Sequence, residues 1–120
     1  MLSYLNSRKV TDDVYRNLLL SGNLQNCKFR VCSINGFGFM MSHFLGQSED
    51  AGYGLIPTNR ILGLDGSNQL AIGLIEGDDV VCMNLDDGSI NLWLLEMADG
   101  ERMTVATSFG EFVTKCQREV

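Results

Sequence analysis

Few side chains of this chain have the types and spacing that catalysis requires. His43 is the only histidine, so a serine or cysteine nucleophile activated by imidazole would have to be built around it. It stands between apolar residues of a predicted strand and has no aspartate or glutamate beside it. We expect a structural histidine, because a reaction needs an assembled site and not only a residue type.

Two pairs of adjacent carboxylates are the next candidates for acid and base chemistry. They are Asp78 with Asp79 and Asp86 with Asp87. Adjacent residues on an extended backbone point to opposite sides, so neither pair forms a ready catalytic dyad. We predict solvated carboxylates in turns and no catalytic residue, and the chain is not expected to be an enzyme.

Metal and cofactor motifs are also incomplete. The cysteines match no common zinc or redox spacing, which predicts reduced thiols: Cys27, Cys32, Cys82 and Cys116. The G-x-G fragments at 36–38 and 52–54 complete neither a dinucleotide fingerprint nor a phosphate loop. We therefore predict no metal and no cofactor.

Four acid–glycine dipeptides, spaced 11, 11 and 12 residues apart, divide the second half of the chain. They are Asp65-Gly66, Glu76-Gly77, Asp87-Gly88 and Asp99-Gly100. Asp-Gly between apolar runs is a strong hairpin signal, because glycine accepts the positive φ of tight turns. Residues 60–106 therefore read as an antiparallel meander of about five strands. Alternation places Leu70, Ile72 and Leu74 on a core face and leaves Ala71 and Gly73 on the other.

The remaining elements complete an α+β domain that spans residues 1–120. Thr11-Asp12-Asp13 is predicted to open a helix, with Thr11 as its cap and two carboxylates in its first turn, and Ser21-Gly22-Asn23 is predicted to end it. An N-terminal hairpin follows, with strands at 27–32 and 37–45, and residues 46–59 read as the longest loop. Ser108 and Glu111 form a capping box that opens a C-terminal helix.

Charge is distributed unevenly along the chain, whose net charge is −6. Residues 61–120 contain eleven acids and three bases, whereas residues 1–60 have a balance of +2. Such a surface repels nucleic acid and anionic membranes and attracts basic proteins. The chain has no apolar run of bilayer length and no secretory signal at its N-terminus, so we expect a cytoplasmic protein.

Several stretches resemble the SUKH superfamily, which includes the SMI/KNR-type proteins. They are VYRNLLLSGN at 14–23, HFLG at 43–46, LGLDGSNQLAIGL at 62–74, DDVVCMNLDDGSINLWLL at 78–95 and VATSFGEFV at 105–113. The resemblance implies an α+β fold with a curved sheet and with helices at one side. It also implies a bacterial immunity protein that binds and neutralises a toxin, often a nuclease, without catalytic residues.

Charge and resemblance together suggest which residues contact a partner. An inhibitor with clustered acids can steer toward the basic surface with which a nuclease grips phosphate. Trp93 is a candidate anchor, because tryptophan is enriched at interfaces, or it packs under the C-terminal helix against Phe109 or Phe112. The predicted partner-binding residues are Asp78, Asp79, Asp86, Asp87, Trp93, Asp99 and Glu101. A monomer is expected in preference to a dimer.

Two other functions fit the same sequence. One is an acidic secretion chaperone that holds an unfolded effector and exposes apolar patches as a dimer. The other is a small-ligand or enzymatic domain near His43 on the small-residue face of the sheet, which is formed by Ala71, Gly73, Cys82 and Trp93.

Overall fold

The structure, a computed structural model, describes residues 1–22, 24, 31–34, 37–75, 79–94 and 101–116. These residues form four helices: α1 (Leu2–Ser7), α2 (Asp13–Ser21), α3 (Leu55–Ile61) and α4 (Phe109–Cys116). They also form six strands: β1 (Val31–Ile34), β2 (Phe37–Phe44), β3 (Gln69–Ile75), β4 (Val80–Asn84), β5 (Ile90–Leu94) and β6 (Glu101–Ala106). The predicted α+β class, with an antiparallel meander and a helix at each end, is confirmed.

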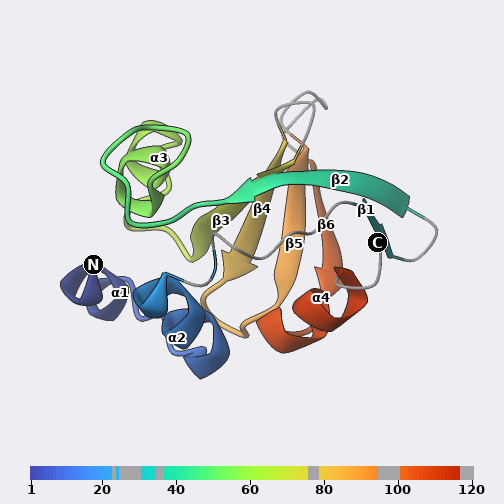
Figure 1. The fold of residues 1–120 in the computed structure, drawn as a ribbon, viewed down its shortest axis with the longest axis horizontal. Coiled ribbons are helices and arrows are strands. Elements are labelled where there is room, and N and C mark those ends of the chain that lie inside the picture. Colours follow the sequence, from blue (N-terminus) through green and yellow to red (C-terminus); the bar gives the residue numbers. More distant parts are fainter. Residues whose placement is uncertain (23, 25–30, 35–36, 76–78, 95–100, 117–120) are drawn as a thin grey trace.

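The strands form one antiparallel sheet in sequential order, β1 to β6. In Figure 1 the long β2 runs across the other strands rather than beside them, so the sheet is strongly coiled. The predicted N-terminal hairpin, β1–β2, is continuous with the meander. Among the described residues of 60–106 there are four strands instead of about five, because the stretch up to residue 64 completes a helix and a turn.

Turn chemistry accounts for most of the element boundaries. The cap of α2 is Asp12 and not the predicted Thr11: the Asp12 carboxylate accepts a hydrogen bond from the backbone N–H of Tyr15. Gly22 ends that helix at φ +79°, as predicted. Gly66 and Gly88 also have positive φ, as predicted for the acid–glycine turns at 65–66 and 87–88. The dipeptides at 76–77 and 99–100 lie outside the described residues.

The predicted loop at 46–59 is wrong in its second half, where α3 begins at Leu55. Pro57, the only proline of the chain, lies within this predicted loop. It stands in the first turn of α3, where a backbone N–H has no partner within the helix, so proline costs no helical hydrogen bond there. The buried face of α3 is short and follows helical spacing at Leu55, Thr58 and Asn59. The sequence also did not predict α1, a six-residue helix.

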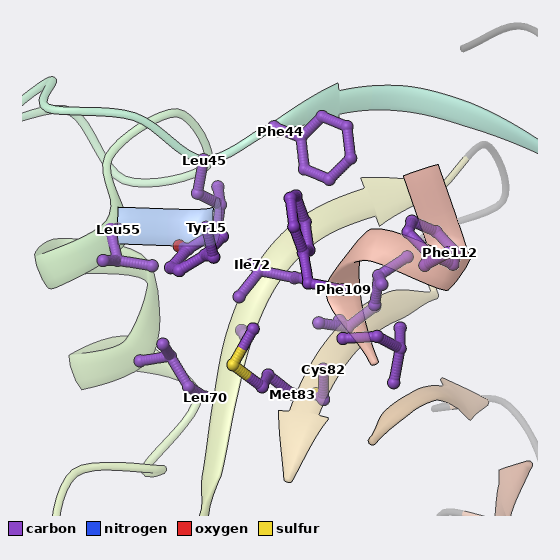
Figure 2. Packing of buried hydrophobic residues seen from close by; sticks show 14 of the residues in the cluster. Tyr15, Phe44, Leu45, Leu55, Leu70, Ile72, Cys82, Met83, Phe109 and Phe112 are labelled. Carbon is purple, nitrogen blue, oxygen red and sulfur yellow. The ribbon is translucent and has the colours of Figure 1, made fainter. Parts of the chain in front are cut away.

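An aromatic cluster joins the helices to one face of the sheet. The Phe109 ring of α4 lies 5.1 Å from the Tyr15 ring of α2 and 6.0 Å from the Phe44 ring of β2, measured between centroids. Figure 2 shows these rings gathered around Ile72 of β3. Phe112 adds a contact with Phe44 at 6.4 Å. We call this side of the sheet the inner face.

A β-bulge corrects the predicted facing of two residues in β3. The pairing of β3 with β4 shifts between Ala71 and Gly73, so Gly73 pairs with Val81 and Leu74 pairs with Val80. A one-residue shift moves side chains to the opposite face of a sheet. Gly73 therefore lies on the inner face, where an added Cβ would stand 3.4 Å from Phe44, and Leu74 lies on the outer face.

Two side chains extend the hydrogen-bond ladder of β3 beyond the point where β2 leaves it. The last backbone contact joins the N–H of Leu45 to the carbonyl of Ile72. Next along β3, the Asn59 amide pairs with both the N–H and the carbonyl of Ala71, and Arg8 donates to the carbonyl of Gln69. Buried backbone groups need such partners, so these contacts hold α3 and the α1 region against the sheet.

The Tyr15 hydroxyl is the exception in this well-bonded core. The side chain is fully buried, and within the described part of the chain its oxygen has no hydrogen-bond partner. Burial raises the pKa of Tyr15 far above its usual value.

We expect Tyr15→Phe to raise the free energy of unfolding by about 1 kcal/mol, because a buried hydroxyl without a partner is costly. Urea unfolding followed by Trp93 fluorescence measures the change. Tyr4→Phe is the contrasting variant, since the Tyr4 hydroxyl donates to Asp65 and accepts from Arg8, and it should lower stability. A clear loss of stability in Tyr15→Phe would contradict the prediction.

Candidate functional site

The meander separates the predicted acidic contacts into two groups. Asp86 and Asp87 lie in the turn between β4 and β5, whereas Asp79 precedes β4 and Glu101 begins β6 at the opposite end of the sheet. Strand β4 lies between the two groups, and five residues extend roughly 16 Å. The structure does not bring these carboxylates together, because successive turns of a meander alternate between the ends of the sheet.

Asp78 and Asp99 lie outside the described residues, and so does the side chain of Glu101. Asp79 is described: it is partly exposed, and its carbonyl accepts the hydrogen bond from the N–H of Ile75 that closes the β3–β4 ladder.

The carboxylates of Asp86 and Asp87 stabilise their own turn. Asp87 Oδ1 accepts hydrogen bonds from the backbone N–H of Ser89 at 2.9 Å and from its hydroxyl at 2.7 Å, and these bonds lower the pKa of Asp87. Asp86 Oδ2 accepts from the Asn68 amide at 2.9 Å. Both aspartates are exposed, so they retain their charge at the surface while shaping the turn.

Two neighbouring hollows border this turn. They have volumes of about 280 and 290 Å³ and share Lys9, Leu85 and Asp86 as lining residues. Lys9 is exposed and adopts φ 59°, the left-handed conformation that follows α1. A cation therefore lies among the acids at this end, which the separation of charge along the sequence did not predict.

Trp93 lies on the outer face of the sheet, opposite the helices. It pairs across the strands with Val80 and Arg102, whereas Phe44 and the α4 rings occupy the inner face. The Arg102 guanidinium lies over the indole, 4.4 Å from the ring centroid. The alternative of Trp93 packing against Phe109 or Phe112 is therefore wrong; it is half-buried, and the side chain over its ring is Arg102.

Polar side chains extend this arrangement across the outer face. Arg102 Nη1 donates to Asn91 Oδ1 at 3.3 Å, and Asn91 Nδ2 donates to Gln69 Oε1 at 3.1 Å. Cys82 is fully buried beneath them, and its burial raises the pKa of the thiol to about 11, with Arg102 acting in the opposite direction. Arg102 is not among the site residues predicted from the sequence, although it is the only base between Ile61 and Thr114.

His43 has structural partners on each side of its ring. Its Nε2–H donates to the Gly52 carbonyl, Nδ1 interacts with the Ser42 hydroxyl, and the ring stacks on Tyr53 with 4.9 Å between centroids. These contacts attach β2 to the loop before α3, as expected of a structural histidine. The described side chains bring no three histidines, cysteines or carboxylates together in a cluster able to hold a metal ion.

Comparison with protein-family models, with curated proteins and with solved structures found no match. Helices among the described residues all fall short of the length and apolarity that a membrane-spanning segment requires. The geometry thus presents two candidate binding surfaces: the exposed acidic turn at Asp86 and Asp87, and the outer face around Trp93 and Arg102.

Proposed function

We propose that this chain is a SUKH-type immunity protein that binds and neutralises a basic partner, a bacterial nuclease toxin. The observation that carries the proposal is the net charge of −8 in residues 61–120, together with the exposed carboxylates of Asp86 and Asp87 in the turn between β4 and β5. The proposal places both proteins in the cytoplasm and the chain in solution as a monomer.

Electrostatic attraction between the two proteins is expected to raise their rate of association more than their affinity. A nuclease carries basic groups where it binds phosphate, and an acidic surface accelerates encounter with such groups and competes for them. The turn at Asp86 and Asp87 suits this role because Ser89 and Asn68 hold both carboxylates in place. Groups fixed in advance lose little conformational entropy on binding.

Affinity recovery of the tagged protein from its native host tests the proposal directly. We expect one basic protein to be retained at low salt, to be encoded beside this gene, and to lose its toxicity when this chain is co-expressed. Several unrelated unfolded effectors would instead indicate a secretion chaperone. Recovery of no protein partner at either salt concentration would overturn the proposal.

Charge variants at the two ends of the sheet show which group steers the partner. Asp86→Asn with Asp87→Asn removes two charges and keeps an oxygen for Ser89 and Asn68, and Asp79→Asn with Glu101→Gln removes two charges at the other end. We expect the first pair to slow association by about tenfold at low salt and to flatten its salt dependence. Stopped-flow association rates across a salt series measure both effects. Equal rates in the native chain and both double variants would contradict electrostatic steering.

A further inference from the structure

The outer face of the sheet presents one arginine whose orientation is already set. Its guanidinium lies 4.4 Å from the centroid of the Trp93 ring, and Nη1 is bonded to Asn91. Asn91 is only 5% exposed and is held in turn by Gln69. Stacking and hydrogen bonding therefore fix the plane of the guanidinium, while the Arg102 side chain remains exposed to solvent.

Such a group is suited to recognition. An arginine held in one conformation loses less side-chain entropy on binding than a free one. Tryptophan and arginine are also the residue types that contribute most often to the energetic centre of protein interfaces. Around the pair, Leu74 is half-buried and Thr104 is exposed, so the outer face combines an apolar platform with a polar margin.

The charge of Arg102 is opposite to that of its surroundings in the sequence. Between Ile61 and Thr114 it is the only base, against ten acids. Arg8 and Arg60 each form an ion pair with Asp65. Among the described residues, Arg102 forms no ion pair. The planar fork of a guanidinium matches the two oxygens of a carboxylate.

We propose that the Trp93–Arg102 pair receives a carboxylate of the protein partner. This inference rests on the proposed function and specifies the partner further: a basic surface that presents an acidic side chain opposite Arg102. The basic groups of such a partner would face the acidic turns of this chain, and its carboxylate would face Arg102. The acidic turns then accelerate its approach, and Arg102 sets the register in which it docks, since like charges placed opposite each other are costly.

Trp93 is the only tryptophan, so its fluorescence reports on this face alone. We compare quenching by iodide, an anion, with quenching by neutral acrylamide at constant ionic strength. Arg102→Gln should lower the ratio of the iodide constant to the acrylamide constant by about twofold or more. Arg60→Gln is the matched control, because it makes the same change in net charge at a side chain that is 72% exposed and distant in sequence. An unchanged ratio in Arg102→Gln would overturn the proposal.

Acetate, a small free carboxylate, tests directly whether the Trp93–Arg102 pair binds a carboxylate. Exchange of chloride for acetate at constant ionic strength should shift the Trp93 indole N–H resonance saturably in the native chain and in Arg60→Gln, and not in Arg102→Gln. Arg102→Lys should retain the iodide preference and weaken the acetate shift, because lysine keeps the charge and loses the planar fork. No shift in the native chain, or an equal shift in Arg102→Gln, would overturn the proposal.

The two proposals fail separately. Quenching and acetate titration use the isolated chain, so a negative result removes the carboxylate site and leaves the acidic steering of a basic partner intact. Failure to recover a basic partner from the host removes the proposed function, whatever the anion response of Trp93.

Discussion

Asn59→Leu is expected to lower the free energy of unfolding by about 3 kcal/mol, since it leaves buried backbone groups without partners. The Asn59 amide donates to the carbonyls of Leu55 at 2.8 Å and Ala71 at 2.9 Å, and its oxygen accepts from the N–H of Ala71 at 2.8 Å. The residue is fully buried, so water does not replace these bonds without opening the structure. Leucine preserves the approximate volume and removes only the polar atoms.

Urea unfolding followed by Trp93 fluorescence measures this loss. Asn17→Ala is the matched control, because Asn17 is exposed on α2, and substitutions at such positions change stability by about 0.5 kcal/mol or less. Hydrogen exchange adds a local readout: the Ala71 amide should lose protection in Asn59→Leu before the other β3 amides do. If Asn59→Leu unfolds at the native urea concentration, the strand-extending role of Asn59 is wrong.

The second large effect is expected at Arg8. Its guanidinium donates to the Tyr4 hydroxyl at 2.6 Å, to Asp65 Oδ1 at 3.0 Å, and to the backbone carbonyls of Leu64 and Gln69. The side chain is only 7% exposed. Methionine has a side chain of similar length to arginine but forms none of these four hydrogen bonds. We therefore expect Arg8→Met to lower the free energy of unfolding by about 2–4 kcal/mol, because partly buried acceptors lose a charged donor.

Arg60 supplies the control for this prediction. It approaches the same Asp65 at 4.0 Å, but its side chain is 72% exposed. Arg60→Met should therefore change stability by about 0.5 kcal/mol or less, as exposed ion pairs contribute little. Similar losses in the Arg8 and Arg60 variants would show that burial does not distinguish the two arginines. Calorimetric or urea unfolding of both variants settles the comparison.

The α2 boundaries illustrate what local signals can predict. Gly22 acts through its own backbone angles, so the sequence indicates the end of α2 directly. The start is displaced by one residue, because threonine and aspartate can both cap a helix and the cap is Asp12 instead of the predicted Thr11. Pro57 shows the limit of such signals, because proline is compatible both with a loop and with the first turn of a helix. The helix is favoured over the loop because α3 buries one face, including Asn59, which hydrogen-bonds to Ala71 of β3.

The candidate site shows the same division. The sequence indicated Trp93 and the acids as candidates. It did not predict that Asp79 lies at one end of the sheet and Asp86 and Asp87 at the other, because this placement follows from the pairing of the strands. Nor did it connect Trp93 with Arg102, since that contact requires the β5–β6 register. Both facts depend on pairing between distant residues and not on local propensity.

Local sequence signals were sufficient to predict the α+β class, the meander and a helix on each side of the sheet, and the excess of acid in the second half can be counted directly. Each of these depends on hydrophobic periodicity, turn residues or charge, which act over a few positions. Tertiary structure decided which face Gly73 and Leu74 occupy, how Asn59 and Arg8 complete the edge of β3, and which side chain covers Trp93. The reason is physical: a β-bulge and a long-range hydrogen bond are selected by the packing of the whole sheet, and no single segment contains that information.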